Sequence, residues 1–463
     1  MAALGHIARL WQIAQGLGSY DVLLPREVAA RYPWPLRLMR GLFSSKAEGP
    51  VGLRLTRALE SLGPTAIKLG QVLACRPDVV GAETAAALSS LQDKLTPFST
   101  VDAKRVVAQS LGKSVKNLFA EFGEPVAAAS IAQVHPALTL DDPPRKVAVK
   151  VLRPAIEVVF AKDMAAFAYA ARLAERFSAE ARRLRFVAVV ETLADAVTVE
   201  LDLRMEAAAA SELADRTKAD AAFHVPAVDW SRTAQRVLTT EWIDGIKISD
   251  KPALEAAGLD PKALALALVR RLLRSALCDG YFHADMHPGN VFATADGRIA
   301  VVDFGIMGRL DLKTRRFMAD VLLGFLQRDY ARVARAHIAY GTVSAAHDEA
   351  LLAQALRAIA EPVLTRPPRE ISMAALLQQL FDTTRRFGMQ TQPQLLLLQK
   401  TMVVVEGVAR SLDADFDMWE CARPVAEEWI RDQMGPKARL ADVVATLKGL
   451  AAQVRDWAAA GRG

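Results

Sequence analysis

The chain has 463 residues, of which 52% are hydrophobic and 24% are charged, and its formal net charge is +6. This length suits two or three lobes better than one small domain. The composition is the reverse of a disordered chain's, which is poor in apolar residues and strongly charged. The positive charge fits an ordinary basic surface as well as attraction to anionic lipid or nucleotide phosphates. Nucleic-acid binding is not expected, because the sequence has no zinc-finger spacing, no aromatic RNA-binding motif and no dense Lys/Arg run.

Cysteine usage and hydropathy further limit the class of protein to which this chain can belong. Cys75, Cys278 and Cys421 lie far apart, which indicates neither a disulfide framework nor a metal-binding set and suits a reducing cytosol. The N-terminal stretch lacks the long apolar core of a secretory signal. No run reaches about 18 apolar residues, so no transmembrane helix is predicted. The nearest candidate, residues 395–408, is interrupted by polar and charged side chains.

Residues 1–112 are predicted to form an N-terminal helical extension. Its turns are expected at Pro25, Pro33 to Pro35, Gly63-Pro64 and Pro77. The character then changes, because short apolar runs separated by turn residues predict three antiparallel strands. These strands are expected over Phe119–Val126, Ile131–Leu138 and Lys146–Leu152, with the Asp141-Asp142-Pro143-Pro144 turn before the third.

From Pro154 to about Lys218 the chain is rich in Ala, Leu, Glu and Arg at helical spacing, and Pro154 suits the first turn of a helix. The later elements are a strand over 236–243, a helix over 261–277, short strands near 291–292 and 299–302, and helices through 311–463. This order, sheet first and helices later, predicts an α+β fold. The predicted domains are residues 1–112, a sheet-containing lobe with a helical insert over 113–245, and a mostly helical lobe over 246–463.

The most informative segment runs from His283 to Asn290 and reads His-Ala-Asp-Met-His-Pro-Gly-Asn, followed across a predicted hairpin by Asp303-Phe304-Gly305. Kinase catalytic loops have the form H-R-D-x-x-x-x-N and precede D-F-G in the same way. In that chemistry one carboxylate orients or deprotonates the attacking oxygen, while an amide and a second carboxylate hold Mg²⁺. Asp285, Asn290 and Asp303 are therefore the candidates for these three roles.

His283 and His287 offer a different interpretation, since two histidines four residues apart can form a zinc pair on a helix. Pro288-Gly289 argues against a continuous helix there, and the sequence offers no evident third ligand. An isolated D-F-G would carry little weight. The complete loop, hairpin and D-F-G in order favour the kinase-like interpretation.

A second kinase-like feature is Val147-Ala148-Val149-Lys150, which is similar to the V-A-I-K strand whose lysine reaches the α- and β-phosphates. Taken alone, it would fit an edge-strand lysine equally well. Upstream, where kinases carry a glycine-rich loop, residues 127–135 read Ala-Ala-Ala-Ser-Ile-Ala-Gln-Val-His and contain no glycine. Alanine in place of glycine should give a stiffer loop with fewer conformations, so nucleotide is expected to bind differently from an ordinary kinase.

Together, the alanine-rich loop, the VAVK strand, the HADMHPGN loop and D-F-G resemble the UbiB (aarF-domain) family. Two further motifs agree, because Lys68-Leu69-Gly70-Gln71 resembles the family's KxGQ motif and Glu200-Leu201-Asp202 its ExD motif. Glu206 then falls where the family's helix glutamate pairs with the strand lysine. The resemblance covers roughly residues 20–430 and implies a two-lobed, protein-kinase-like fold, in which residues 113–245 are the N-lobe and 246–463 the C-lobe.

The resemblance implies a role for each matching residue. Lys150 is expected to contact the α- and β-phosphates and to be held by Glu206, and Asp285 to occupy the catalytic-base position. Asn290 and Asp303 are expected to hold Mg²⁺.

The other motifs are expected to complete the site. Lys68 and Gln71 are expected inside it, and Glu200 and Asp202 to contact metal or Lys68, although such a carboxylate pair ordinarily lies on a solvated helix face. Main-chain groups of the Glu241-Trp242-Ile243 strand are expected to form the adenine hinge. The loop candidates for nucleotide contact are Ala127, Ala128, Ala129, Ser130 and Ile131.

The segment after Asp303-Phe304-Gly305 lacks an A-P-E motif and a Ser, Thr or Tyr for activation, and residues 308–312 lead almost directly into a helix expected at Thr314. The platform that docks a peptide in protein kinases is therefore expected to be missing. In the family, the KxGQ element also covers the site. Both features argue against phosphorylation of proteins in trans.

The implied function is that of an atypical kinase-like ATPase, a phosphotransferase-like enzyme that binds ATP or ADP with Mg²⁺ and supports ubiquinone biosynthesis. The expected place is cytoplasmic and peripheral to the inner membrane, with membrane lipids and quinone intermediates or their enzymes as partners. Two alternatives stay open. One is a small-molecule phosphotransferase of the aminoglycoside or choline kinase type, which shares the H-x-D-x-x-x-x-N loop, and the other is a nucleotide-sensing pseudokinase scaffold.

Two amphipathic segments bear on the membrane question. Residues 440–457 would form a helix that either packs on the C-lobe or lies in the bilayer interface. Its apolar face comprises Leu440, Val443, Val444, Leu447, Leu450, Val454 and Trp457. The N-terminal segment with Leu10, Trp11, Ala14 and Leu17 poses the same choice.

Overall fold

The computed structural model describes residues 2–22, 48–74, 80–88, 91, 96–344, 346–364 and 392–434, and between the last two ranges residues 372, 376–377, 379–380, 382–383 and 387–388. The chain divides into two compact units. Unit 1 comprises residues 1–208 and 227–242, and unit 2 comprises residues 209–226 and 243–463. The turns expected at Pro25, Pro33 to Pro35 and Pro77, together with the amphipathic stretch 440–457, lie outside the described residues.

Unit 1 begins with helices, as predicted for the N-terminal extension. They are α1 (Ala2–Ser19), α3 (Val51–Leu62), α4 (Pro64–Ala74), α6 (Ala82–Leu88) and α7 (Thr100–Leu111). The expected turn between α3 and α4 is present at Gly63, whose φ of 97° favours glycine, and Pro64 opens the next helix. The first three helices after α1 share a core of Leu59, Ala66, Leu88 and Leu91.

A five-stranded antiparallel sheet follows these helices. Its strands are β1 (Phe119–Phe122), β2 (Ala127–Ala128), β3 (Ala132–Thr139), β4 (Lys146–Leu152) and β6 (Val237–Glu241). The strand order is β1-β3-β4-β6, with β2 also paired to β3. The three predicted strands are confirmed, although the first is shorter than expected and β2 forms separately after it. The strand predicted over 236–243 ends at Glu241.

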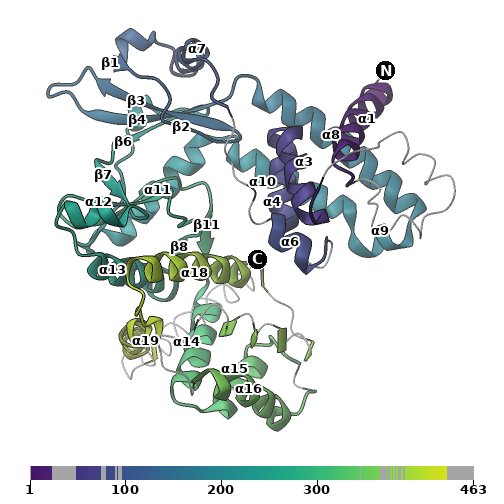
Figure 1. Ribbon diagram of the computed structural model, residues 1–463, viewed down its shortest axis with the longest axis vertical. Helices are drawn as coiled ribbons and strands as arrows, with labels where there is room; N and C mark the ends of the chain where they lie inside the picture. The colour runs from purple at the N-terminus through teal and green to yellow at the C-terminus, as the bar shows by residue number, and fades with distance from the viewer. Residues whose placement is uncertain are drawn as a thin grey trace, which may run out of the picture. The chain divides into compact units, whose positions relative to one another are not determined.

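Different helices cover the two faces of this sheet (Figure 1). One face packs on α7, and its core includes Val106, Val107, Val149 and Val151. The other face packs on α8 (Ile156–Phe177) and α10 (Phe186–Glu200), and its core includes Leu152, Phe160, Leu193 and Leu238. Because successive strand residues point to opposite faces, Lys150 lies on the same face as Leu152.

The helical insert predicted over 154–218 is confirmed. It contains α8, α9 (Ala179–Leu184), α10 and α11 (Leu203–Thr217), and the boundary between the units falls within α11. The expectation that Pro154 lies in a helix first turn is wrong. The helix α8 begins at Ile156, and Ala155 before it has a φ of 54°. Pro154 instead belongs to the turn that leaves β4 after Arg153 bonds back to the Ile131 carbonyl at 2.8 Å.

Unit 2 contains two small sheets. The first has the order β5 (Phe223–His224), β10 (Ile299–Val301), β9 (Val291–Thr294) and β7 (Gly245–Lys247), and the second pairs β8 (Tyr281–His283) with β11 (Met307–Arg309). The predicted hairpin is confirmed as β9 and β10, turned by Gly297 at a φ of 80°. The remaining strands are too short to show an alternating pattern, so they carry no sequence signature.

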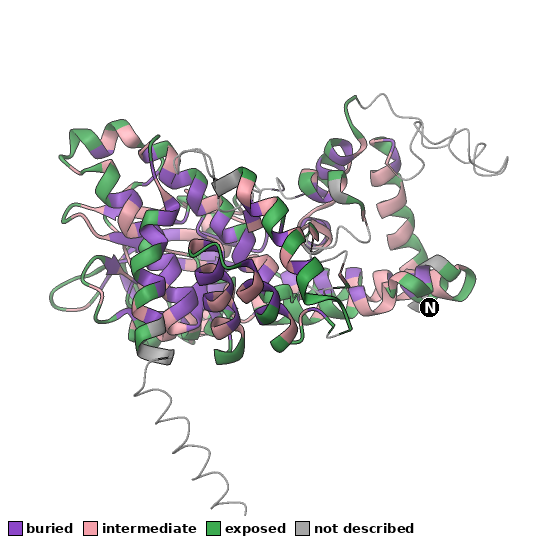
Figure 2. Ribbon diagram, turned by 90° about the horizontal axis from the view of Figure 1, so that it is seen from below, coloured by how far each residue is buried: buried purple, intermediate pink, exposed green. Residues whose placement is uncertain are grey.

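The rest of unit 2 is helical, as predicted. Its helices are α12 (Lys251–Ala256), α13 (Pro261–Arg274), α14 (Leu312–Leu326), α15 (Tyr330–Ala339), α16 (Glu349–Leu364), α18 (Pro393–Leu412) and α19 (Met418–Met434). The helices α13 and α18 pack side by side (Figure 1), and Figure 2 shows that buried and exposed residues alternate around such helices. Among the described helices, none combines the length and the apolar character needed to cross a membrane.

The helix predicted over 261–277 changes geometry near its end. The α-helix stops at Arg274 and continues as a π-helix over Ser275–Asp279. Gly280, with a φ of 64°, ends the π-helix and leads directly into β8. Because no residue separates Gly280 from β8, the end of the π-helix sets the position at which the HADMHPGN loop begins.

Candidate active site

Lys150 and Glu206 form a buried ion pair in unit 1. Lys150 lies on β4, and Glu206 lies in the first turn of α11. The Lys150 Nζ atom is 2.8 Å from Oε1 and 2.9 Å from Oε2 of Glu206, and the two side chains are 14% and 9% exposed. Because a buried charge without a partner is costly, each residue holds the other in place. The structure therefore contains the pairing that the sequence motifs imply.

The alanine-rich loop is closed on itself. Ala127 and Ala128 pair with β3, and the Ala129 N–H donates to the Ala132 carbonyl at 2.7 Å. The Arg153 guanidinium donates from Nη2 to the Ala129 carbonyl at 2.9 Å. Hydrogen bonds from its own backbone and from Arg153 thus restrain the loop, and its stiffness relative to a glycine-rich loop stays a prediction.

The last two loop candidates are both buried. Ser130 is fully buried, and its Oγ has no hydrogen-bond partner within the described part of the chain. Ile131 is 9% exposed and belongs to the core that also contains Leu152. The Ile131 side chain therefore anchors the loop in the core of unit 1. The Ser130 hydroxyl makes no hydrogen bond within the described residues.

The expected hinge coincides with a boundary between the units, since unit 1 ends at Trp242 and unit 2 resumes at Ile243. The Glu241 N–H donates to the Ala227 carbonyl at 2.8 Å, and the Trp242 N–H donates to the Lys146 carbonyl at 3.2 Å. These two donors are engaged within unit 1. The N–H of Ile243 makes no hydrogen bond within the described residues, so Ile243 is the hinge position with a donor to offer.

The KxGQ motif lies on α4. Lys68 is buried, and its Nζ atom is 2.8 Å from a carboxylate oxygen of Glu200 at the end of α10. Gly70 allows close packing, because a Cβ at this position would lie 2.3 Å from Leu91 and 2.7 Å from Leu59. Gln71 is half-buried on the same helix. The glycine of the motif is thus required by helix packing.

The ExD motif links two helices. Glu200 ends α10 and pairs with Lys68, as described above, whereas Asp202 immediately precedes α11. The Asp202 carboxylate accepts from the Arg204 N–H at 3.1 Å and pairs with the Arg204 guanidinium at 2.6 Å, which lowers the Asp202 pKa. Asp202 therefore acts as an N-terminal cap of α11, the helix that carries Glu206. Neither carboxylate lies on a simple solvated helix face.

The catalytic-loop histidine His283 is fixed and neutral. Its Nδ1 accepts from the Asp285 N–H at 3.2 Å, so the ring proton is on Nε2, which donates to the Val302 carbonyl at 3.2 Å. Burial lowers the pKa of His283, which favours the uncharged ring. The Phe304 ring packs edge-on against it, with centroids 5.5 Å apart. His283 thereby holds the main chain of Asp285.

Asn290 and Asp285 are joined within the loop. The Asn290 Nδ2 donates to the Asp285 carbonyl at 3.1 Å and lies 3.5 Å from the Asp285 carboxylate. The Asn290 side chain is nearly buried, whereas the Asp285 side chain is 37% exposed. The amide nitrogen is therefore committed to the loop, which leaves the Oδ1 oxygen for another ligand. The Asp285 carboxylate remains accessible at the surface of unit 2.

Asp303 occupies a strained backbone conformation. Its φ of 65° lies in the left-handed region, which a residue with a Cβ adopts at a cost in free energy. Its carboxylate lies 3.4 Å from the Gly305 N–H. Phe304, beside it, is 3% exposed and anchors the segment in the core. Such strain is commonly found where function dictates the direction of a side chain.

The zinc-pair alternative for His283 and His287 is wrong. Both ring nitrogens of His283 are engaged in hydrogen bonds inside unit 2, and the His287 Nδ1 accepts from the Gly289 N–H at 3.0 Å. In the part of the chain that the structure describes, no three His, Cys, Asp or Glu side chains gather in a metal-binding arrangement. The two histidines instead shape the loop.

Known proteins are similar in sequence to this chain over most of its length. The ABC1 atypical kinase-like domain matches residues 90–337, and the UbiB helical domain matches residues 356–417. A protein of Marinobacter nauticus named "Probable protein kinase UbiB" is 43% identical over 442 residues, which cover 93% of this chain and 80% of that protein. A protein of the same name from Azotobacter vinelandii is 40% identical, with coverages of 90% and 80%. The chain belongs to the UbiB family.

The fold of this UbiB-family chain has a solved counterpart. The structure of Rv3197 from Mycobacterium tuberculosis, determined as its erythromycin complex, matches with a TM-score of 0.52 at 22% identity. The match covers 86% of this chain and 97% of that chain. Together with the ABC1 domain match, it confirms the α+β, protein-kinase-like fold predicted from the sequence.

In this UbiB-family chain, little main chain separates D-F-G from the next helix. The strand β11 begins at Met307 and pairs with β8, and α14 begins at Leu312. Asp311 caps α14 by accepting from the Thr314 N–H at 2.7 Å. The helix therefore starts slightly before the expected Thr314. The described residues between β11 and α14 are too few to form a peptide-docking segment.

Two further residues, which belong to none of the sequence motifs, support the catalytic loop of this UbiB-family chain. The Thr401 hydroxyl, on α18, lies 3.0 Å from the Ala284 carbonyl and 2.9 Å from the Leu397 carbonyl of its own helix, so its one proton is shared between the two acceptors. Gly308, on β11, lies directly over the Phe282 ring, where a Cβ would come within 2.1 Å of a ring carbon. A threonine within the apolar run of residues 395–408 is the one sequence signal that could have pointed to Thr401.

Proposed function

We propose that this UbiB-family protein is an Mg–ATP-binding, kinase-like ATPase that supports ubiquinone biosynthesis at a membrane. The observation that carries the proposal is the buried Lys150–Glu206 pair. A kinase-like lysine serves the nucleotide phosphates only when the helix glutamate holds it in position. A chain that no longer used nucleotide would gain nothing from burying these two charges.

The donor atoms of unit 2 suit a magnesium ion. The Asn290 Nδ2 is committed to the Asp285 carbonyl, so the hard oxygen Oδ1 is the ligand atom left over. The Asp303 carboxylate is the second candidate ligand, and its strained backbone fixes its direction. When bound, Mg–ATP supplies the phosphoanhydride bond and the divalent charge that neutralises its oxygens. Asn290 and Asp303 would hold the ion, and Lys150 would contact the phosphates.

The other residues of the candidate site have supporting roles in this proposal. Asp285 orients the attacking oxygen or accepts its proton, while the neutral His283 keeps the Asp285 main chain in place. The unused Ser130 hydroxyl and the Ile243 N–H offer hydrogen bonds to nucleotide. Lys68, held by Glu200, provides a second positive charge in unit 1.

The substrate in this proposal is a small hydrophobic molecule. The relatives carry names that say protein kinase, but the short connection from β11 to α14 gives a peptide nothing to dock on. We therefore propose that ATP hydrolysis helps to present quinone precursors to partner enzymes. Efficient phosphorylation of a generic protein by the purified chain would contradict this part.

The charge and the surface of unit 1 support contact with a membrane. The chain carries a formal net charge of +6, which attracts anionic lipid. Large apolar side chains of α1 and α8 face solvent, and among them Phe177 is 77% exposed and Trp11 is 50% exposed. Exposed aromatic side chains of this kind suit the headgroup region. We propose a peripheral association with the cytoplasmic side of the inner membrane.

The test is Mg²⁺-dependent ATP hydrolysis by the purified chain and by Asp303→Asn, with and without anionic liposomes. Asparagine tolerates the left-handed φ at least as well as aspartate, so this variant removes the charge without straining the backbone. We expect slow hydrolysis by the wild type, faster hydrolysis with liposomes, and a loss of about a hundredfold or more in the variant.

Other outcomes would point to the alternatives. Nucleotide binding without hydrolysis under any condition would favour a pseudokinase scaffold. ATP-dependent consumption of a soluble small alcohol, unaffected by liposomes, would favour a small-molecule phosphotransferase.

A further inference from the structure

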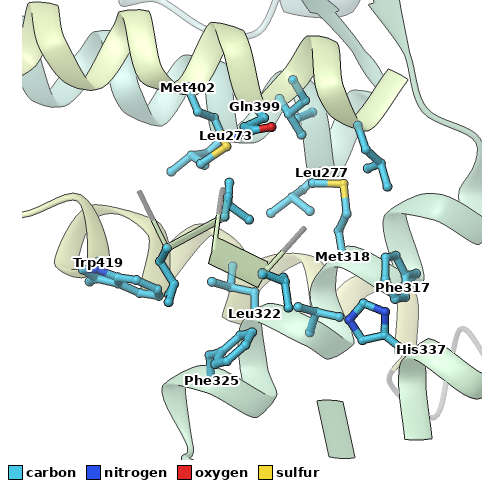
Figure 3. Close-up of a pocket in the computed structure, with 17 residues that line it drawn as sticks. Leu273, Leu277, Phe317, Met318, Leu322, Phe325, His337, Gln399, Met402 and Trp419 are labelled. Carbon is cyan, nitrogen blue, oxygen red and sulfur yellow. The ribbon is translucent and has the colours of Figure 1, made fainter. Parts of the chain in front are cut away.

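Unit 2 contains a partly open apolar cavity of about 110 Å³ that plays no part in the candidate active site (Figure 3). Its walls come from α13, the π-helix, α14, α15, α18 and α19, with described residues between α16 and α18. Apolar side chains dominate the lining, among them Leu273, Leu277, Leu322, Phe325 and Met402. The wall also includes three side chains that carry polar nitrogen or oxygen atoms, His337, Gln399 and Trp419.

His337, on α15, presents a bare ring nitrogen. It is 1% exposed, and burial lowers its pKa to about 4, so the ring is neutral near pH 7. The Thr342 hydroxyl lies 3.0 Å from the ring Nδ1 and 2.8 Å from the His337 carbonyl, so Nδ1 is hydrogen-bonded. The other ring nitrogen, Nε2, has no partner within the described residues.

Trp419 carries a second polar atom without a partner. Its indole Nε1–H is also buried and lacks a hydrogen-bond partner in the described part of the chain. In Figure 3, Trp419 and His337 lie at opposite ends of the cavity, with leucine side chains between them. Buried polar atoms are nearly always hydrogen-bonded, and an unpaired one costs free energy. The unpaired ring nitrogen of His337 in the wall of an apolar cavity therefore indicates a missing polar partner.

We propose that this cavity binds a small, mostly apolar molecule whose hydroxyl group forms a hydrogen bond with His337 Nε2. The apolar body of such a ligand would fill the space between the leucines. A cavity of about 150 Å³ holds benzene, so this smaller one suits at most about six non-hydrogen atoms, or one end of a longer molecule. Water alone fits poorly, because a buried water needs two to four polar partners close together.

The helix α18 connects this cavity to the catalytic loop. It contributes Gln399 and Met402 to the wall, and the hydroxyl of Thr401, between them, lies 3.0 Å from the Ala284 carbonyl next to Asp285 and 2.9 Å from the Leu397 carbonyl, so its proton is shared between the loop and the helix. A ligand that shifts or stiffens α18 would therefore act on the loop through one hydrogen bond. We infer that occupancy of the cavity changes the order of the HADMHPGN loop, and this part rests on the proposed function.

The binding test compares cyclopentanol with methylcyclopentane, which replaces the hydroxyl by a methyl group. Saturation-transfer NMR on the nucleotide-free, full-length chain should show cyclopentanol binding roughly tenfold more tightly. Leu322→Phe fills part of the cavity and should abolish binding of both. Leu326→Phe, on the same helix α14 but outside the wall, is the matched control and should bind as the wild type does.

His337→Phe tests the hydrogen bond itself. This variant should still bind methylcyclopentane, which shows that the cavity is intact, while the preference for cyclopentanol disappears. Equal affinity of the wild type for both probes would overturn the assignment to His337. Failure of both probes to bind at millimolar concentration would overturn the cavity as a binding site.

The coupling between the cavity and the HADMHPGN loop is measured without relying on ATP hydrolysis. Amide hydrogen exchange of residues 281–290 should change on addition of cyclopentanol in the wild type and not in Thr401→Val, which keeps the shape of the side chain but loses the donor. Unchanged exchange in the wild type with bound cyclopentanol would overturn the coupling. If no ATP hydrolysis is found at all, the proposed function fails while the binding and exchange results stand by themselves.

Discussion

The ammonium group of Lys68, on α4, lies 2.8 Å from a carboxylate oxygen of Glu200, at the end of α10. The two residues belong to separate sequence motifs, and the ion pair brings them together inside unit 1. The Lys68 side chain is 10% exposed and that of Glu200 is 22% exposed. At such burial, removing one partner leaves the other charge poorly solvated, so the pair should matter for stability as well as for the site.

We expect Lys68→Met and Glu200→Gln each to lower the free energy of unfolding by about 1–3 kcal/mol, because each leaves one charge without its partner. The double variant should lose less than the sum of the single losses, since it removes both charges together. Urea unfolding of the wild type, the two single variants and the double variant measures these free energies of unfolding. Glu191→Gln, an exposed position on α10, is the control and should change stability by less than about 0.5 kcal/mol. Single variants as stable as the wild type would contradict the importance of the pair.

Much of the site could be predicted from the sequence because its chemistry lies in short, contiguous motifs. The loop from His283 to Asn290 contains its catalytic candidates at fixed spacing, and Lys150 follows from the alternation of its strand. The pairing of Lys150 with Glu206 needed the family pattern, because nothing local to either residue indicates the other. The motifs thus specify residue types, while the family specifies their partners.

What could not be predicted depends on tertiary contacts. The sequence shows only that Gly70 belongs to the KxGQ motif. The structure gives the reason for the glycine, because Leu59 and Leu91 leave no room for a side chain there. Thr401 supports the catalytic loop from a helix distant in sequence. The His337 Nε2, unpaired within the described residues, lies in a cavity wall built from helices far apart in sequence. No periodicity or propensity reports such contacts.

Lys150→Met should reduce ATP hydrolysis by about a hundredfold or more, because it removes the charge proposed to contact the phosphates. Glu206→Gln should cause a smaller loss, about tenfold, since the amide keeps a hydrogen bond to Lys150 but loses the charge that fixes it. Steady-state hydrolysis and nucleotide affinity are the measurements. Lys162→Met, exposed on α8, alters the net charge equally and should leave both unchanged. Equal losses in this control and in Lys150→Met would refute the assigned role.

Arg153→Ala should loosen the alanine-rich loop. The Arg153 guanidinium donates to the Ala129 carbonyl at 2.9 Å and to the Thr96 carbonyl at 3.0 Å, so it ties the loop to the segment before α7. We expect faster amide exchange over residues 127–132 and a stability loss of about 1–2 kcal/mol. Arg153→Lys, which keeps the charge but lacks the rigid fork of the guanidinium, should lie between. If exchange over 127–132 is the same in all three proteins, the loop is held by its own backbone bonds alone.

The buried histidine His337 should make stability depend on pH. Its pKa is about 4 in the folded chain because burial disfavours the charged ring, whereas an unfolded histidine has a pKa of about 6.5. The unfolded state therefore binds the proton more readily, and the stability present above pH 6.5 is lost as the pH falls towards 4, by up to about 3 kcal/mol. Urea unfolding from pH 7.5 to 4.5 should show this loss in the wild type and a shallower decline in His337→Phe. Identical slopes in the two proteins would mean that another group takes up the proton. In that case the neutral state assigned to the His337 ring would have to be reassigned.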